Sequence, residues 1–318
     1  MLVPKVLGSL PAMRPRGIFL LDQNSAELIY GPEQHTQIAE LVEVTDRLDQ
    51  AEVIFSGWGA PVMDEKFLAD APAVKAVFYG AGTIRGFVTE AFWQRGIVVT
   101  SAYAANAVPV AEYTLATTLL SLKKFWQQRG LVRAAAVPGA YRSTVGIISL
   151  GMVGREVWRR LQHHDLQLIA FDPFTKPAGI EMVSLAEVFR RADVVTLHTP
   201  NLPETRGMIT GEHFAMMKPG ATFINTARGA IIRENELIDV LRQRPDLTAV
   251  LDVTNPEPPA PDSPLRTLPN VILTPHIAGS MGAECRRMGQ YMVEELRRYL
   301  AGKPLQWQIT KDKAALLA

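Results

Sequence analysis

Short apolar runs alternate with amphipathic stretches along almost the whole of this 318-residue chain. Strands that are apolar on both faces and are separated by helices are typical of parallel sheets covered by helices on both sides. The pattern therefore predicts an α/β fold with two doubly wound parallel-sheet lobes, and the length allows about two domains. The expected strands are 17–21, 51–56, 73–79 and 96–100 in the first lobe, and 144–149, 166–171, 192–198, 220–225, 247–253 and 270–274 in the second.

Helices are expected between these strands. In the longest one, Val108–Lys124, Pro109 falls in the first turn, where a missing N–H costs least. The proline-dense segment 254–264 predicts an irregular surface loop. The other expected helices are 33–42, 65–69, 152–164, 184–191, 211–217, 234–244 and 281–300.

Composition excludes several classes of function. The formal net charge is +1 and no basic stripe with interleaved aromatic residues occurs, so neither nucleic acid nor an anionic membrane is an expected partner. Cys285 is the only cysteine, which excludes an intramolecular disulfide and a cysteine-cluster metal site. No His, Asp and Glu residues show metal-ligand spacing, so we expect no metal. A reducing, cytoplasmic compartment fits this cysteine usage.

The stretch "VGIISLGMVGREVW" (145–158) reads as a strand, a glycine turn and a helix. Gly151 and Gly154 occupy the second and third positions of the dinucleotide fingerprint G-x-G-x-x-G, and Ser149 replaces the first glycine. The helix start at Met152 and Val153 would offer N–H groups to a pyrophosphate. Serine is acceptable at the first position if its φ is negative, and its hydroxyl is then available to cap the helix.

Asp172 supports a dinucleotide site, because it ends the next strand 21 residues after Gly151. An acidic residue there is expected to hold the adenine ribose hydroxyls. Its carboxylate would repel a 2′-phosphate, which favours NAD over NADP. The alternative is a plain helix-capping turn, followed by an aspartate that belongs only to its own "DP" turn.

Polar residues follow three strands of the second series, in "INTARG", "LDVTNPEP" and "LTPHIAGS". Because ligands bind beyond the carboxyl ends of strands in open α/β sheets, Arg228, Glu257 and His276 are expected to converge. Arginine can grip a carboxylate, histidine can transfer a proton, and a carboxylate beside the histidine fixes its tautomer. Taken singly, each has a structural alternative: an ion pair at a sheet edge, a solvated loop residue and a turn histidine.

Five segments in order resemble the D-isomer-specific 2-hydroxyacid dehydrogenase family: "VGIISLGMVG", "LHTPNLPETRGMI", "MKPGATFINTARGAIIRENELIDVL", "LDVTNPEPP" and "NVILTPHIAG". The resemblance implies NAD-linked interconversion of a 2-oxo acid and a D-2-hydroxy acid. It implies that Arg228 binds the substrate, that His276 is the acid/base and that Glu257 is its partner. The residues implied to line the cofactor are His198, Thr199, Pro200, Thr226, Ala227, Arg228, Asp252, His276 and Ala278.

The resemblance also implies a Rossmann NAD-binding domain over 105–283. Residues 1–104 and 284–318 would then form a flavodoxin-like substrate-binding domain, and the protein would be a homodimer. Backbone N–H groups near Ala81 and Gly82 are implied to hold the substrate carboxylate. Trp58 would contact the substrate, or it would pack as a loop residue on its own lobe.

The loop "YGAGTIRGF" (79–87) departs from the family, because Ile84, Arg85 and Phe87 replace polar residues. Arg85 is either an anion contact or a solvated loop residue. No arginines of the phosphoglycerate type lie near Trp58, which argues against a phosphorylated substrate. Two rival hypotheses remain open. One is a catalytically weak, NAD-sensing protein that resembles corepressors of this fold, and the other is an NADP-preferring reductase.

Overall fold

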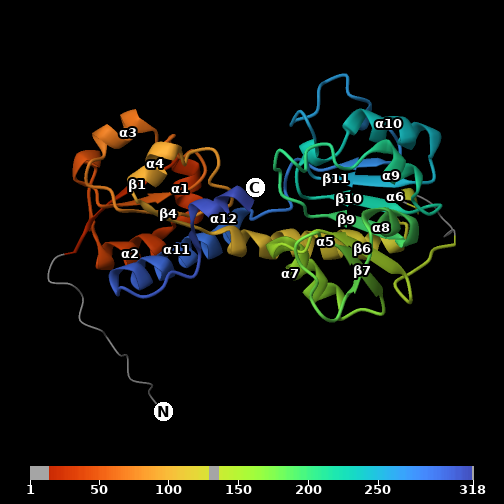
Figure 1. Cartoon of the computed structure of the whole chain (residues 1–318), viewed down its shortest axis with the longest axis horizontal. Helices are drawn as coiled ribbons and strands as arrows, with labels where there is room; N and C mark the ends of the chain where they lie inside the picture. Colours follow the sequence, from red (N-terminus) through yellow and green to blue (C-terminus); the bar gives the residue numbers. More distant parts are fainter. Residues whose placement is uncertain (1–13, 129–135, 317–318) are drawn as a thin grey trace, which may run out of the picture. The chain divides into compact units, whose positions relative to one another are not determined.

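The computed structural model describes residues 14–128 and 136–316. The chain divides into two compact units, one made of residues 1–106 with 280–318 and the other of residues 107–279. Figure 1 shows a sheet with covering helices in each unit. The predicted domain limits were 104/105 and 283/284, whereas the observed limits are 106/107 and 279/280. The second unit is therefore slightly shorter at both ends than predicted.

The first unit contains a six-stranded sheet in the order β13-β5-β4-β3-β1-β2. Its first five strands pair in parallel, in the 2-1-3-4-5 order of flavodoxin-like folds. The strands are β1 (Arg16–Leu20), β2 (Glu43–Val44), β3 (Val53–Ser56), β4 (Ala76–Tyr79), β5 (Val98–Ser101) and β13 (Gln308–Ile309). The helices are α1 (Gln23–Ile29), α2 (Pro32–Leu41), α3 (Glu65–Asp70), α4 (Glu90–Gln94), α11 (Cys285–Leu300) and α12 (Lys311–Leu316).

Two apolar clusters cover the faces of this sheet. Phe55 and Phe78 pack with α1, α2 and α11 on one face, while Ile54 and Val77 pack with α3 and α4 on the other. Neighbouring residues of a strand point to opposite faces, so a strand buried on both sides is apolar throughout. This is why four-residue runs such as "VIFS" and "AVFY" suffice as strands here.

The second unit contains a seven-stranded parallel sheet in the order β12-β11-β10-β9-β6-β7-β8. Read from β6, this is the Rossmann order 3-2-1-4-5-6 with one further strand. The strands are β6 (Thr144–Ile148), β7 (Gln167–Phe171), β8 (Glu181–Met182), β9 (Val194–Leu197), β10 (Thr222–Asn225), β11 (Thr248–Leu251) and β12 (Val271–Leu273). The helices are α5 (Tyr103–Leu122), α6 (Phe125–Gln128), α7 (Met152–Leu161), α8 (Leu185–Arg191), α9 (Gly211–Ala215) and α10 (Glu234–Gln243).

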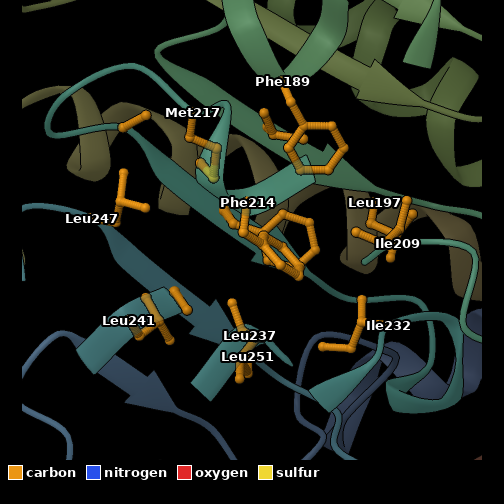
Figure 2. Close-up of a cluster of buried hydrophobic side chains, with 14 of the residues drawn as sticks. Phe189, Leu197, Ile209, Phe214, Met217, Ile232, Leu237, Leu241, Leu247 and Leu251 are labelled. Carbon is orange, nitrogen blue, oxygen red and sulfur yellow. The ribbon is translucent and has the colours of Figure 1, made fainter. Parts of the chain in front are cut away.

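Figure 2 shows the larger core of this unit, where Phe189, Phe214 and Leu237 meet residues of the sheet. They come from α8, α9 and α10, which therefore cover one face. Residues of α5 and α7 cover the opposite face. Phe223 and Ile224, adjacent in β10, belong to the two different clusters. The sheet is thus buried on both sides, and ligands can reach its strands only at their ends.

Two predictions about these elements need correction. The long helix begins at Tyr103, so Pro109 lies inside it rather than in its first turn. The alanine-rich stretch before the proline is a good helix former, and Asn106 already donates a helical hydrogen bond to the Ala102 carbonyl. The first sheet is also not wholly parallel, because β13 pairs antiparallel with β5. Within the described ranges, no helix is long and apolar enough to cross a membrane.

Candidate active site

The strand order of the second unit reverses between β6 and β9, which are neighbours in the sheet. The turn after β6 and the segment after β9 therefore leave the same sheet edge on diverging paths. In doubly wound folds the crevice at such a reversal is where nucleotides bind. The predicted glycine turn and His198–Pro200 lie at this point.

The two glycines of the turn have different surroundings. A β-carbon at Gly154 would overlap the carbonyl of Ser149, so only glycine lets α7 pack this closely on the turn. At Gly151 a β-carbon would meet none of the described residues within 4 Å, so this position faces open space. Gly151 is also the N-cap of the ten-residue helix α7, and in the part of the chain that the structure describes no side chain caps that end. The first N–H groups of the helix are left for an anion.

Ser149 differs from the expectation in two ways. Its φ is +73°, in the left-handed region, whereas a negative φ was the condition for serine here. Its hydroxyl does not cap the helix but lies 2.8 Å from the Thr199 hydroxyl, across the strand reversal. The turn keeps the backbone shape that suits glycine because Gly154 packs against the Ser149 carbonyl.

Asp172 is a buried carboxylate, 9% exposed, that ties the turn to the end of β7. Its Oδ2 accepts a hydrogen bond from the Leu150 N–H at 2.7 Å. Its Oδ1 accepts from the N–H groups of Phe174 and Thr175 at 2.8 and 3.0 Å. The carboxylate therefore shapes the glycine turn and its own turn together. Since Oδ2 has only one of these partners, it retains acceptor capacity for a ribose hydroxyl.

Two buried polar atoms at the same edge have no hydrogen-bond partner within the described residues: His198 Nδ1 and Thr226 Oγ1. The other ring nitrogen of His198 lies 3.0 Å from the Thr196 hydroxyl. Burial lowers the pKa of His198 to about 3, so the ring is neutral. Buried polar groups are normally satisfied, so two orphans at the predicted cofactor edge indicate that a polar ligand completes it. Pro200 and Ala227 lie close to His198 and Thr226 in the sequence. Their carbonyls accept hydrogen bonds from Thr205 and Arg228.

Arg228 follows β10 and is mostly shielded from solvent. Burial lowers the pKa of Arg228, and the negative charge of Glu257 opposes this shift. The guanidinium donates to the adjacent Ala227 carbonyl at 2.6 Å, but in the described part of the chain it has no carboxylate within 4.0 Å. Gly229 can only be glycine, because a β-carbon there would overlap the Thr254 carbonyl. This packing holds a partly desolvated cation whose fork is open to an anionic ligand.

His276 and Glu257 form a direct pair, with His276 Nδ1 and Glu257 Oε1 2.5 Å apart. Their side chains are 48% and 38% exposed, so the pair is open to solvent and to a small ligand. The φ of His276 is +55°, a left-handed value that is uncommon outside glycine. The pair leaves His276 Nε2 available for proton transfer, since Nδ1 faces the carboxylate.

The buried side chain of Asp252 holds the backbone on either side of His276. Its Oδ1 accepts from the Thr274 hydroxyl at 2.6 Å and from the Ile277 N–H at 2.9 Å, and its Oδ2 accepts from the Ala278 N–H at 2.9 Å. The Tyr113 hydroxyl of α5 lies 2.8 Å from the Thr274 hydroxyl and extends this network. Asp252 is thus a positioning residue for the histidine loop.

A cavity of about 420 Å³ lies within the second unit, beside His276. Asp252, Glu257 and His276 line it, together with Thr254, Thr274 and prolines of the 256–264 loop. The structure therefore brings Glu257 and His276 together at one opening. Arg228 is not part of that lining, although the charge of Glu257 acts on it.

Comparison with known proteins bears on this arrangement. Residues 115–278 match the family model of the D-isomer specific 2-hydroxyacid dehydrogenase NAD binding domain. The (S)-sulfolactate dehydrogenase of Chromohalobacter salexigens is 33% identical over 273 residues, which are 79% of this chain and 88% of that protein. The chain belongs to the D-isomer specific 2-hydroxyacid dehydrogenase family.

A D-3-phosphoglycerate dehydrogenase of Mycobacterium leprae is 32% identical over 294 residues, covering 89% of this chain. This chain spans 54% of that relative's length, so it corresponds to about half of such an enzyme. Among solved structures, the apo D-mandelate dehydrogenase of Rhodotorula graminis has a TM-score of 0.80 at 23% identity, covering 94% of this chain and 98% of that one. That likeness confirms the two-lobed α/β fold.

The residues present fit the NAD of this family. Gly151 leaves open space at a helix N-terminus, and His198 and Thr226 carry unsatisfied buried atoms along the adjacent strand ends. The predicted NAD-binding domain is therefore supported both by the family match and by the chemistry of these groups.

The first unit explains the unusual loop 79–87. Ile84 and Phe87 are 4% and 3% exposed and belong to its core, where the Phe87 ring lies 4.6 Å from that of Tyr79. The Ser101 hydroxyl lies 2.9 Å from the Ala81 carbonyl and 2.5 Å from that of Gly82. The family's polar residues are thus replaced by apolar anchors that keep this turn in place.

Arg85 and Trp58 are both exposed residues of the first unit. Arg85 is exposed and donates to the Ala315 carbonyl at 3.1 Å, near the end of α12. Trp58 is 38% exposed at the end of β3, where Gly59 has a φ of +80°. Its ring is therefore partly available to a ligand.

The sequence did not indicate Tyr113 or Thr274 as site residues, and it did not indicate that Asp252 holds the histidine loop by hydrogen bonds. Tyr113 lies in an apolar helix and looks like a core residue, while Thr274 lies at a strand end. The adjacency of Thr274 to "PHIAG" was the one available signal. Nothing in the local sequence indicates that a tyrosine 161 residues earlier reaches it.

Proposed function

We propose that this chain is an NAD-dependent 2-oxo acid reductase and D-2-hydroxyacid dehydrogenase. The observation that carries the proposal is the His276–Glu257 pair, 2.5 Å apart, on the same sheet edge as Arg228. An exposed histidine–carboxylate pair can exchange a proton, and a partly buried guanidinium without a carboxylate partner can take a carboxylate ligand. The match to a family of NAD binding domains supports a nicotinamide cofactor at this edge.

The chemistry follows from these groups. Arg228 binds the carboxylate and the carbonyl oxygen of the oxo acid, so that the C=O bond is polarised. NADH, when bound, supplies the hydride that the carbonyl carbon accepts. His276 donates the proton from Nε2 to the carbonyl oxygen, and Glu257 keeps the opposite ring nitrogen protonated and the ring oriented. Hydride and proton together convert the ketone to a secondary alcohol, and the reverse reaction uses neutral His276 as base.

Cofactor preference is proposed to rest on Asp172. Its carboxylate is held by three backbone N–H groups at the end of β7, where the adenosine ribose is expected. A 2′-phosphate there would meet a fixed negative charge, so NADH should bind more tightly than NADPH. Titration with both cofactors tests this, and tighter NADPH binding would favour the NADP-preferring alternative.

The substrate is proposed to be a small 2-oxo acid without a phosphate group. Relatives are named for phosphoglycerate and sulfolactate, which carry a second anion. In the first unit Arg85 is already bonded to the Ala315 carbonyl, and the ligand-facing candidate Trp58 is aromatic. Ala81 and Gly82 are proposed to contribute backbone N–H groups to the substrate carboxylate.

The test is oxidation of NADH by the purified chain with glyoxylate, hydroxypyruvate, pyruvate, longer oxo acids and phosphohydroxypyruvate. At least one unphosphorylated acid should be reduced, and phosphohydroxypyruvate should be a poorer substrate. Tight NADH binding with no oxidation by any of these acids would instead favour the NAD-sensing, corepressor-like alternative.

Two further proposals follow from the family resemblance and from cysteine usage. We propose a homodimer, which light scattering of the purified chain would test. We also propose a cytoplasmic location, since the single thiol, Cys285, is 1% exposed and burial raises its pKa, so it takes no part in a disulfide.

A further inference from the structure

Ser149 keeps a side chain where the turn suits glycine. Its φ of +73° places the backbone in the left-handed region, where a β-carbon is crowded by the following carbonyl oxygen. Its N–H donates to the Phe171 carbonyl at 2.8 Å, and Gly154 packs against its carbonyl. The residue therefore cannot change conformation without opening the turn. A serine here is strained in a way that glycine would not be.

The Ser149 hydroxyl is paired with one that is remote in the sequence. Its Oγ lies 2.8 Å from Thr199 Oγ1, 50 residues later, and the two residues are 9% and 4% exposed. Ser149 is the first residue after β6 and Thr199 is the second residue after β9, so the pair spans the strand reversal. It thus lies at the point where a dinucleotide crosses the sheet edge.

A count of hydrogens shows that this pair is incomplete. Two hydroxyls bring two O–H hydrogens, and their mutual bond uses one. Neither hydroxyl makes a second hydrogen bond within residues 14–128 and 136–316. One buried O–H donor therefore remains, next to the uncapped N-terminus of α7 and to His198, whose Nδ1 also has no partner in those ranges. Buried donors without acceptors are unfavourable, so this one indicates a ligand acceptor.

We propose that the Ser149–Thr199 hydroxyl pair is a cofactor-binding element that donates a hydrogen bond to the pyrophosphate of the dinucleotide. This inference rests on the proposed NAD-dependent function and adds one side-chain hydrogen bond to it. The serine at the first glycine position then strains the backbone and in return provides a hydrogen bond to the phosphate. The N–H groups of α7 and the spare O–H act on the same anion.

Binding titration of four variants tests the pair. Ser149→Gly removes the hydroxyl and suits the φ, Ser149→Ala removes the hydroxyl and keeps the strain, and Thr199→Val removes its partner. Each should raise the Kd for NADH and for ADP-ribose about tenfold, because a hydrogen bond to a charged group is lost. The Ser149→Gly, Thr199→Val double variant should bind no worse than about the weaker single variant, since both changes break one pair. Binding of adenosine, which has no phosphate, should be unchanged.

Thr222→Val is the matched control. Thr222 is 1% exposed at the start of β10, at the opposite edge of the same sheet, and its hydroxyl has no partner in the described part of the chain. Its removal should leave the NADH Kd unchanged. In thermal melts without cofactor, Ser149→Gly should be more stable than Ser149→Ala because only alanine keeps the strain.

The alternative is that the hydroxyl pair only ties β6 to β9. Variants that melt earlier without cofactor but retain the wild-type NADH Kd would show this and would overturn the inference. A wild-type chain that binds neither NADH nor ADP-ribose would overturn the proposed function as well, and this separates the two failures.

Discussion

Replacement of Asp252 with asparagine removes one carboxylate oxygen from a position where both oxygens accept hydrogen bonds. The Asp252 carboxylate is 2% exposed and accepts three hydrogen bonds, from the Thr274 hydroxyl and from the N–H groups of Ile277 and Ala278. Asparagine offers one oxygen and one NH₂ group. In either orientation of its amide, the NH₂ therefore faces at least one backbone N–H.

The cost can be worked out from these contacts. One charge-assisted hydrogen bond is lost and one buried N–H is left unsatisfied, which together amount to about 3 kcal/mol. For a unit of this size we expect the melting temperature to fall by about 6–12 °C. His276, at a φ of +55°, loses the support that holds the next two residues. A misplacement of about 1 Å would lower kcat about 100-fold.

Thermal melts and kcat for oxo-acid reduction at saturating NADH are the assays. Thr274→Val is the control, because it removes one hydrogen-bond donor to Asp252 and leaves both backbone N–H groups bonded to the carboxylate. It should cost about 1 kcal/mol and lower kcat less than about tenfold. An Asp252→Asn variant with wild-type melting and wild-type kcat would refute the positioning role.

The remaining predictions concern the turn, acid stability and substrate binding. Gly154→Ala should prevent stable folding of the second unit, since its β-carbon would overlap the Ser149 carbonyl, whereas Gly151→Ala should fold normally and bind NADH more weakly; circular dichroism and titration distinguish them. The Arg244 hydrogen bond lowers the pKa of Asp246 from 3.8 to about 2, so this stabilisation is present above pH 3.8 and is lost as the pH falls toward 2. Melts between pH 4 and 2 should therefore fall less for Asp246→Asn than for the wild type, and parallel curves would contradict this. Arg228→Lys should lower kcat/KM for the oxo acid about 100-fold with an unchanged NADH Kd, because the bidentate fork is lost; an equal loss of NADH binding would count against this role.

Much of the fold could be predicted because its strands are buried on both faces. Each of the ten predicted strands overlaps a strand of the structure, from β1 to β12. A short unbroken apolar run is typical of a strand that is covered on both faces. The two-residue strands β2, β8 and β13 were missed, because an edge pair of this length leaves no periodic signal. The start of α5 was missed because Pro109 was taken as a helix start rather than as a residue inside a helix.

A site residue could be predicted from the sequence where a single physical requirement allows only one residue type. Gly154 is an example, since only glycine allows the close approach of α7. Ser149 could not be predicted in this way, because its φ is held by the packing of Gly154 on its carbonyl and its hydroxyl is bonded to a partner 50 residues away. The pairing of His276 with Glu257 agrees with the expected chemistry, while their catalytic roles stay predictions. Asp252 was expected to line the cofactor, which stays a prediction, and the structure adds that its oxygens are bonded to the histidine loop.

The most direct test of the account compares the wild type with His276→Gln in a single assay of 2-oxo acid reduction at saturating NADH. Glutamine keeps a polar group of similar reach but cannot donate the proton as an imidazolium does. We predict that the wild type produces the D-2-hydroxy acid and that the variant loses at least about 100-fold in kcat with an unchanged NADH Kd. A variant that reduces the acid at the wild-type rate would contradict the central claim.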